Sequence, residues 1–532
     1  MDSVGASFLS AAPEVTLVNC FRRPYDHAVA AARTCYSGAG IVTAEQVAGD
    51  NAPDEEARAR ARQRRDALAA SIFQAGHHTV FQHAHFQFAL ANVSRHFTWS
   101  FLHSHPFYNS EQVSQRYVAV QEGNYAVPPL AGEALATYRE TVQAQLDAYH
   151  QLCQALAKPA AAAYFQRFPG RARQPEQWQS EVNKKAMEVA RYVLPVATFT
   201  YLYHTVSSLT LFRYHQMCRL YDAPLEQQIV VGKMVECLLA AEPEYARLYD
   251  EPIPLEETPE HAFVASRTAA ETRPAAFRAE FDASLEGHVS RLVDWKTNHE
   301  TILAQSVREV LGLPRAALDD DEAIRLVLDP GRNPLLGQTL NLTAHGKLTR
   351  CLAHAAYTFR KKLSHTADSQ DQRHRTTPGS RPLLAAHLDG EPDYITPELV
   401  RHDEACERLY AQTMARSWEG MSRLSALGVP AEYALYLLPN AAAIRFTESA
   451  DLLSLRHKLA MRLCFNAQEE IWRASLDEAR QIRALNPRIG RYLLPPCGLR
   501  HLAGERPICP EGKRFCGIPV WKQDLDAYRR VI

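Results

Sequence analysis

Short alternating stretches and longer helical patterns divide this chain. Phe86 and Phe88 fall on one face of an alternating stretch at residues 81–90, which predicts a strand. Most other hydrophobic positions recur at the three-to-four-residue spacing of amphipathic helices. Helices are predicted at residues 28–33, 57–72, 133–156, 181–194, 205–239 and 277–311. The pattern indicates a mixed α+β protein.

Residues 192–212 carry no formal charge and resemble a membrane span at first sight. The stretch contains Pro195, His204 and several Ser and Thr residues. A bilayer helix would hold those polar groups in hydrocarbon at considerable cost. We therefore interpret the stretch as a buried core helix.

Two distant segments of the chain resemble one another. Residues 189–195, Val-Ala-Arg-Tyr-Val-Leu-Pro, match residues 433–439, Tyr-Ala-Leu-Tyr-Leu-Leu-Pro, and residues 352–359 resemble residues 81–88. Counted from the two prolines, three further pairs fall at the same offset: Cys218 and Arg462, Ala223 and Ala467, and Glu226 and Glu470. A repeat of this length predicts duplication of a whole domain, with two copies packed about a pseudo-twofold axis.

A proline-rich, acidic stretch separates the two copies. The prolines are Pro243, Pro252, Pro254 and Pro259. We expect four parts: a first domain at residues 1–250, a linker at 251–276, a second domain at 277–490 and a cysteine-containing tail at 491–532.

Composition indicates a globular protein of a reducing compartment. Of the 532 residues, 46% are apolar and 22% are charged. The net charge of -1 gives no general attraction to nucleic acid or to an anionic membrane. The N-terminus does not resemble a signal peptide, and the odd number of cysteines, 11, predicts mostly free thiols. We expect a cytoplasmic protein with no nucleic-acid or membrane partner.

The tail contains four residues that in principle could bind zinc. They are Cys497, His501, Cys509 and Cys516. Their spacing is irregular and includes no Cys-x-x-Cys pair. Free thiols in an ordered loop are the favoured interpretation, so no metal site is predicted.

The densest cluster of candidate binding groups is Gln-Asp-Gln-Arg-His-Arg at residues 370–375. Arg373 and Arg375 offer planar guanidinium forks that fit phosphate or carboxylate. His374 adds a ring that can stack on or hydrogen-bond to a heterocycle, and Gln370 adds an amide with both donor and acceptor. The cluster suits a nucleotide or a flavin, although a solvated basic turn would show the same residues.

Together these segments resemble the signature of the flavin-dependent thymidylate synthases. That family carries Arg-His-Arg, a Ser-x-Arg-Tyr loop, an Ala-Arg-x-Val-Leu-Pro segment and a late helical arginine. The resemblance implies an antiparallel sheet with helices in each copy. The chain is therefore expected to be a tandem duplication of this fold.

Each copy has kept a different part of the signature. The first copy keeps the loop and the Val-Leu-Pro arginine, at Ser114, Arg116 and Arg191. The second copy keeps the complementary residues, which are Gln370, Arg373, His374, Arg375 and Arg462. The lost parts are replaced by Leu102-His103-Ser104 and Cys218 in the first copy and by Leu435 in the second. The losses are complementary.

The resemblance implies one composite site between unlike domains, because the family builds each deoxyuridylate site at a subunit boundary. The substrate phosphate would be held by Ser114, Arg116 and Arg191, with Gln112 beside them. Gln370 would contact the uracil edge. The candidate catalytic residues are Arg462 and Arg373. Flavin contacts are implied for Arg373, His374, Arg375, His77, Thr79 and His457.

The implied reaction methylates C5 of dUMP. Its implied cofactor is FAD, with NADPH and methylenetetrahydrofolate as cosubstrates. Two fused chains would form a homodimer that reproduces the family's four-domain assembly. Two alternatives stay open: a non-catalytic protein that binds a nucleotide or a flavin, which the incomplete motifs favour, and a purely structural scaffold.

Overall fold

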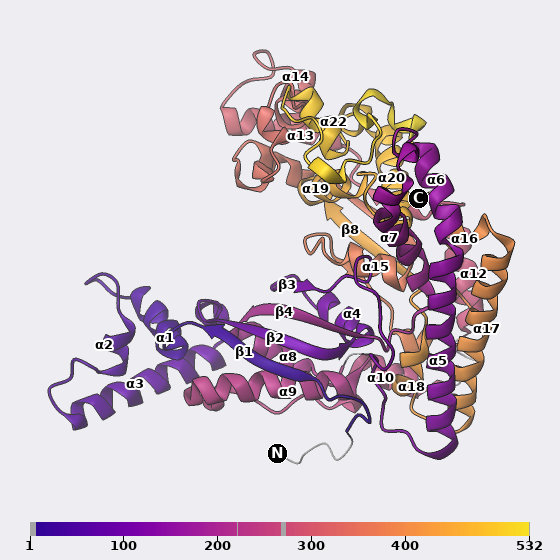
Figure 1. The fold of residues 1–532 in the computed structure, drawn as a ribbon. Coiled ribbons are helices and arrows are strands. Elements are labelled where there is room, and N and C mark those ends of the chain that lie inside the picture. The colour runs from indigo at the N-terminus through magenta and orange to yellow at the C-terminus, as the bar shows by residue number, and fades with distance from the viewer. Residues whose placement is uncertain (1–6, 221, 268–272, 531) are drawn as a thin grey trace.

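Two four-stranded sheets organise the computed structural model, which describes residues 7–220, 222–267, 273–530 and 532 (Figure 1). The strand orders are β1-β2-β4-β3 in the first half of the chain, up to residue 267, and β5-β6-β8-β7 in the second half. Every pairing is antiparallel. The strands are β1 (Glu14–Cys20), β2 (His85–Ser94), β3 (Asn109–Gln112), β4 (Phe199–Ser207), β5 (Ser290–Trp295), β6 (Ala356–Ser364), β7 (Gly379–Ser380) and β8 (Ala443–Asp451). The protein is α+β, as predicted.

Helices cover the sheets and connect the halves. In the first half they are α1 (Pro24–Thr34), α2 (Ala44–Ala48), α3 (Glu55–Gln74), α4 (Arg95–His103), α5 (Gly132–Ala155), α6 (Ala157–Arg167), α7 (Gln179–Ala190), α8 (Ser208–Met217), α9 (Pro224–Ala241) and α10 (Pro259–Ala265). In the second they are α12 (Pro274–Ser284), α13 (His299–Leu311), α14 (Asp320–Leu328), α15 (His365–Asp371), α16 (Glu398–Arg401), α17 (Glu404–Ala426), α18 (Ala431–Ala434), α19 (Leu452–Arg462), α20 (Glu469–Leu485), α21 (Pro487–Gly490) and α22 (Pro496–Leu502).

Both sheets end in the same way where they approach the junction of the halves. Strand β2 ends at Ser94, which caps α4, and β6 ends at Ser364, which caps α15. Each serine hydroxyl also donates to a buried glutamate at 2.6 Å, Ser94 to Glu226 and Ser364 to Glu470. These anchors fix where the segments after β2 and β6 begin.

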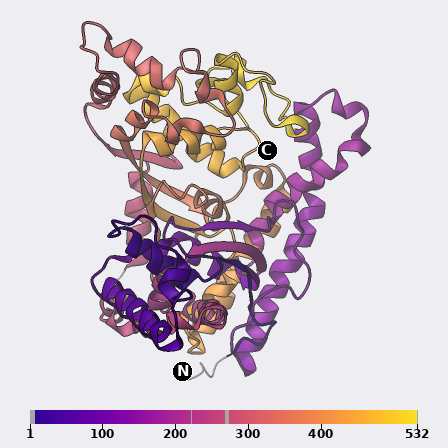
Figure 2. The same ribbon diagram turned by 90° about the vertical axis from the view of Figure 1, so that its left-hand side faces the viewer.

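The halves meet through reciprocal contacts. The Val196 N–H donates to the Leu438 carbonyl at 2.8 Å, and the Asn440 N–H donates to the Leu194 carbonyl at 2.8 Å. Helices α5 and α17 run side by side, and α5 to α7 extend along the second half (Figures 1 and 2). One hydrophobic core lies within the first half, while the other joins the second half to α5, α6 and α7.

Three predicted helices are wrong in part. Residues 192–212 instead hold β4, an inner strand of the first sheet. Its Leu202, His204 and Val206 side chains are buried, whereas Tyr201 and Tyr203 are exposed. The prediction at 205–239 covers the end of β4 and then α8 and α9, while 277–311 contains β5 between α12 and α13. Among the residues described, none of the helices has the length and hydropathy needed to span a membrane.

Candidate active site between the two halves

The Arg-His-Arg segment lies in the loop between α15 and β7, beside the end of α19. Arg462, the last residue of α19, donates from Nε to His374 Nε2 at 2.8 Å. Its Nη2 donates to the Gln370 carbonyl at 2.7 Å. One guanidinium therefore bridges the two ends of the segment and fixes the loop that carries Arg373.

Burial sets the charges of this loop. It lowers the pKa of Arg462 to about 10, while Asp371 opposes that effect and Arg373 and Arg116 add to it. Arg462 is still a cation at neutral pH. Burial also holds the pKa of His374 well below its usual range, and the charge of Arg462 adds to this. The imidazole is thus neutral, with Nε2 accepting from Arg462 and the proton on Nδ1.

A loop of the first half lies against this segment. Arg116 donates from Nη2 to the Asn466 carbonyl at 2.9 Å and pairs through Nε with Glu188. The Ser114 hydroxyl accepts from the backbone N–H of Arg116 at 3.2 Å. Because Asn466 follows Arg462 by four residues, the Ser-x-Arg loop and the late helical arginine meet within one chain.

Two further contacts join β3 to the Arg-His-Arg segment. Arg373 pairs with Glu111 at 2.6 Å, and Arg375 donates to the Asn109 side chain at 3.2 Å. The Arg373 and Glu111 side chains are 52% and 75% exposed, so this pair contributes little to stability. Both arginines could therefore exchange these partners for a ligand at small cost.

Arg191 forms the centre of a group of buried cations. Its Nε donates to the Glu188 carbonyl at 3.1 Å, and its Nη2 has no hydrogen-bond partner within the described chain. Burial lowers the pKa of Arg191; the Glu188 carboxylate opposes this shift and Arg116 adds to it. Arg95 donates to Gln112 at 3.1 Å, and burial, with the charge of Arg191 adding to it, lowers its pKa. The guanidiniums of Arg116, Arg191 and Arg530 all act on the Glu188 carboxylate, a gathering of cations that suits a phosphate dianion.

A hydrogen-bonded chain connects Gln370 to the first half. Gln370 donates to Gln468 at 2.6 Å, Gln468 donates to the Tyr192 hydroxyl, and Tyr192 donates to Glu470 at 2.7 Å. Burial raises the pKa of Glu470 to about 7, and the bonds from Ser364 and Tyr192 oppose that shift. The amide of Gln370 is thereby oriented by residues of both halves.

The structure brings most of the predicted site residues into one neighbourhood. These are Ser114, Arg116 and Arg191 from the first half, and Gln370, Arg373, His374, Arg375 and Arg462 from the second. Gln112 joins them through Arg95. His457 also lies nearby, with its ring centroid 6.1 Å from that of His374, and it lines a cavity of about 290 Å³.

His77 and Thr79 are not part of this neighbourhood. Both are exposed at the start of a 3₁₀ turn, His78–Gln82, which precedes the His85 end of β2. The junction lies at the opposite end of that strand, at Ser94. A contact from these two residues to a ligand at the Arg-His-Arg loop of the same chain is therefore not supported by the structure.

Two cavities lie between the halves at the Arg-His-Arg loop. One of about 280 Å³ is lined by residues 102–106 of the first half and by His374, Arg375 and Arg381 of the second. The other, of about 90 Å³, lies between residues 108–112 and Arg373 and Arg375. A ligand entering either cavity would meet guanidiniums, and in the larger cavity it would also meet the neutral imidazole of His374.

Comparisons with known proteins match both halves of the chain to one family. The family described as thymidylate synthase complementing protein matches residues 16–244 and 291–488. A flavin-dependent thymidylate synthase of Geobacter sulfurreducens is 31% identical over 170 residues, which are 31% of this chain and 70% of that protein. One of Clostridium tetani is 26% identical over 210 residues, or 38% of this chain and 74% of that protein. The chain belongs to the flavin-dependent thymidylate synthase family.

The residues of this flavin-dependent thymidylate synthase family member fit part of a flavin. Arg373 and Arg375 could pair with anionic groups, and the neutral ring of His374 could contact a heterocycle in the larger cavity. His77 and Thr79 lie beside the His85 end of β2, whereas the junction is at the Ser94 end. They therefore do not complete the same binding region within one chain. The structure therefore offers flavin contacts on the second-half side.

In this family member, internal pairs fill the place where a reciprocal site would lie. Asp368 accepts from Trp99 Nε1 at 2.8 Å and from Arg381 at 2.8 Å. His103, in the segment that replaces Arg-His-Arg, lies 3.2 Å from the same carboxylate, and burial lowers its pKa to about 4. Arg381 is thus already neutralised, whereas Arg191 keeps an unpaired donor.

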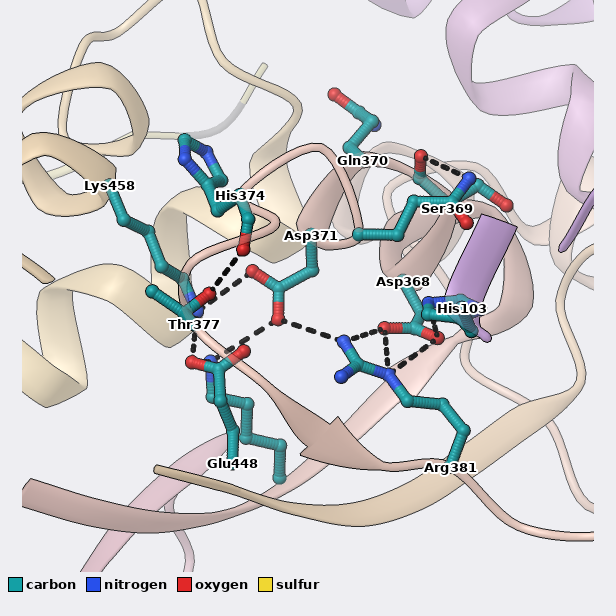
Figure 3. Close-up of polar contacts among 12 residues, drawn as sticks. His103, Asp368, Ser369, Gln370, Asp371, His374, Thr377, Arg381, Glu448 and Lys458 are labelled. Carbon is teal, nitrogen blue, oxygen red and sulfur yellow. Dashed lines mark hydrogen bonds and ion pairs between the residues drawn. The ribbon is translucent and has the colours of Figure 1, made fainter. Parts of the chain in front are cut away.

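Sequence reasoning missed a buried charge cluster directly behind the Arg-His-Arg loop (Figure 3). Its members are Lys361, Asp371, Glu448, Lys458 and Glu478. Lys361 lies 2.8 Å from Glu448 and 2.7 Å from Glu478, and Lys458 lies 2.8 Å from Asp371. A signal was present, because Lys361 continues the alternation of buried Tyr357 and Phe359 along β6.

A cavity of about 650 Å³ lies beside this site rather than in it. It is lined by residues of α6 and α7 and by the tail, including Arg167, Arg171 and Lys513. Its lining includes Lys185 and Asn466, which contact residues of the candidate site and which sequence reasoning also missed.

Proposed function

We propose that this protein is a flavin-dependent thymidylate synthase with one composite site per chain. It would methylate C5 of dUMP, using FAD, methylenetetrahydrofolate and NADPH. The observation that carries the proposal is the contact of Arg116 with Asn466, four residues after Arg462. Through it, the loop retained by the first half and the arginine retained by the second face the same space.

In this proposal the first half binds the phosphate of dUMP. Arg191 offers its unpaired Nη2, Ser114 offers a hydroxyl, and Arg116 would exchange its internal partner for the phosphate. Charge-assisted, bidentate contacts of this kind are the strong ones in phosphate recognition. Gln112, through Arg95, supports the same loop.

The second half would act on the uracil ring. C5 is a weak nucleophile, so a cation near the pyrimidine carbonyl is needed to stabilise the enolate that forms as C5 attacks. Arg462 stays charged and is held by His374 and Gln370, which gives it that role, with Arg373 beside it. A bound flavin supplies the hydride chemistry, while the protein positions and polarises the substrate.

Release of tritium from C5-labelled dUMP, with folate and NADPH supplied, tests this proposal. Arg462→Ala should reduce turnover by at least 100-fold, because a lost charge contact in a transition state costs about 3 kcal/mol. Arg219→Ala, next to the Cys218 that replaces this arginine in the first half, should retain turnover. Equal losses in both variants would contradict the assignment.

A second candidate is a protein that binds a nucleotide or a flavin without turnover. It is favoured by the internal partners of two proposed ligand-binding arginines, Glu188 on Arg116 and Glu111 on Arg373. A yellow protein that binds dUMP but releases no tritium would establish this alternative. A colourless protein that binds neither ligand would favour a scaffold.

We also infer that the chain arose by tandem duplication, with domains at residues 1–250 and 277–490, a linker at 251–276 and a tail at 491–532. The identical strand orders and the reciprocal backbone contacts across the junction support this origin. Two chains, each with two domains, would then form a cytoplasmic homodimer. Its domain number would equal that of the family's tetramer.

A further inference from the structure

Four cysteines of the second half surround one small cavity. They are Cys464, Cys497, Cys509 and Cys516, and the cavity has a volume of about 20 Å³. A space of that size holds a single water-sized sphere. Cys464 follows α19, Cys497 lies in the first turn of α22, and the other two flank the 3₁₀ turn Gly512–Arg514. Segments far apart in sequence therefore bring four thiols to a space that fits one ion.

We propose that these four cysteines form a structural zinc site. Zinc prefers four tetrahedral nitrogen or sulfur ligands, and sites with four cysteines are a common structural type. His501, one of the four residues expected from the sequence, is exposed and lies outside the cavity. Cys464, which sequence spacing did not single out, lines the cavity instead. Four sulfurs around one small space match the ligand number of a single zinc ion.

The surroundings of the thiols are suited to thiolates. The backbone N–H groups of Asn466 and Glu511 hydrogen-bond to the sulfurs of Cys464 and Cys509, each from two residues downstream. Four thiolates would repel one another in so small a space. A divalent cation between them would remove that repulsion.

The charges balance when zinc binds. Four S–H groups release four protons, four Zn–S bonds form, and the site carries a net charge of -2. Two guanidiniums face it: Arg167 hydrogen-bonds to Cys516, and Arg116 is attracted to Cys464. Within the described residues no three His, Cys, Asp or Glu side chains are positioned to hold an ion as they stand, so the sulfurs would close inward by rotation about χ1.

The zinc site would attach the tail to the loop that carries Asn466. This loop accepts the hydrogen bond of Arg116, and it follows Arg462 directly. The ion therefore has a structural role beside the candidate active site, and the proposal does not depend on which reaction that site performs.

Zinc content per chain tests the proposal. The full chain, purified without chelators, should contain about one zinc and release four protons per zinc on titration of the apoprotein. Cys509→Ser should reduce zinc content to below one fifth, whereas Cys35→Ser, at an exposed thiol far along the chain, should retain it. Wild-type protein without zinc, even after incubation with zinc and reductant, would overturn the proposal.

Cobalt substitution separates loss of the site from loss of the fold. Wild-type protein with Co²⁺ should show intense thiolate-to-cobalt charge-transfer bands and the d–d bands of tetrahedral coordination. Octahedral spectra without charge transfer, or iron in place of zinc at the same stoichiometry, would contradict the assignment to a four-cysteine zinc site.

Discussion

Arg191 and Leu435 show at single-residue scale how the two halves differ. Both residues open the same 3₁₀ turn of the repeat and both are buried. Leu435 needs no polar partner, whereas Arg191 leaves Nη2 unpaired and has its pKa lowered by burial. A buried, partly unpaired guanidinium is costly to the fold. That cost is explained if the group is kept for an anionic ligand.

Arg191→Leu is therefore expected to remove binding without harming the fold. Leucine is already accommodated at the equivalent position of the other half, so the melting temperature should be unchanged or higher. Loss of a charged hydrogen bond to phosphate costs about 1.5–3 kcal/mol, so the Kd for dUMP should rise roughly 10- to 100-fold. Calorimetric titration with dUMP measures this.

Lys184→Met is the matched control for that change. Lys184 lies on the exposed side of α7 and pairs only with Glu181 in the structure. It should leave the Kd for dUMP unchanged. Unchanged affinity in Arg191→Leu, or equal losses in both variants, would contradict a phosphate-binding role for Arg191.

At the scale of elements, equivalent positions of the two sheets are surrounded by different kinds of side chain. In the strand pairing, Phe88 of β2 lies opposite His204 of β4, and Phe359 of β6 lies opposite Glu448 of β8. Phe88 corresponds to Phe359 in the repeat, and His204 corresponds to Glu448. Around His204 the first half packs Phe101 and Tyr214, with ring centroids 4.9 and 5.8 Å away. Around Glu448 the second half instead buries the charge cluster of Figure 3.

This cluster contains more carboxyls than cations. With the adjoining Arg381–Asp368 pair included, the cations are Lys361, Lys458 and Arg381, and the carboxyls are Asp368, Asp371, Glu448 and Glu478, all with side chains at most 8% exposed. Burial, and then the charge of Asp371, raises the pKa of Glu448 to about 7. Glu448 is thus the carboxyl that retains a proton. Asp371, with its pKa held low by Lys361 and Lys458 against burial, stays charged behind the Arg-His-Arg loop.

Stability should therefore depend on pH through Glu448. Its folded pKa lies above the unfolded value of 4.5, so between these values the folded state holds a proton that the unfolded state has released. That contribution to the free energy of unfolding is complete below pH 4.5 and is lost as pH rises through 7. Glu448→Gln, which mimics the protonated form, should gain stability relative to wild type from pH 5 to pH 8.

Urea unfolding across this pH range measures the difference. Glu391→Gln, at an exposed carboxyl, is the control and should follow the wild-type profile. A constant difference between Glu448→Gln and wild type at every pH would show that Glu448 is ionised in the folded state throughout, contrary to this account.

The sequence predicted local elements better than their pairing. Helices α1, α5 and α7 follow their hydrophobic periodicity closely, because amphipathic spacing is a local property. Helix α3 is hardly amphipathic and was predicted from its charged run followed by an apolar run. Strand β4 was predicted as a helix because its exposed face carries Tyr201 and Tyr203, so its one-sided burial does not appear as an alternation of apolar and polar residues. Strands β1 and β5 were missed, since short edge strands depend on pairing with distant β2 and β6.

The candidate site was predictable only as far as its motifs. Arg116 and Arg462 stood out because guanidiniums at recognisable positions carry a signal in the sequence. Their shared neighbour Asn466 and the fourth thiol, Cys464, lie in a loop without a motif, and only the folded chain places them. Asp371 stood within the cluster at 370–375, but its role depends on Lys361 and Lys458, which come from other elements.

At the scale of the whole molecule, the junction between halves takes the place of a subunit boundary. The Arg116 to Asn466 contact and the Arg373 to Glu111 pair both cross it within a single chain. Helices α5 and α17 hold the junction, where Gln145 donates to Ser417 at 2.9 Å. Each chain should thus be self-sufficient for the proposed reaction, whatever assembly it forms.

Complementation between inactive variants tests that self-sufficiency. Arg116→Ala and Arg462→Ala each remove one side of the proposed site, so each should be inactive. If the site lies within one chain, every chain of a mixed assembly still lacks one side, and mixing the variants, with subunit exchange verified by native mass spectrometry, should restore no tritium release. A site shared between chains of a dimer would instead be rebuilt in mixed dimers, with recovery of about a quarter of wild-type activity from random pairing. Such recovery would show that the composite site lies at an interface between chains and not at the junction within one chain. Only at such an interface could an intact Arg116 of one chain meet an intact Arg462 of another.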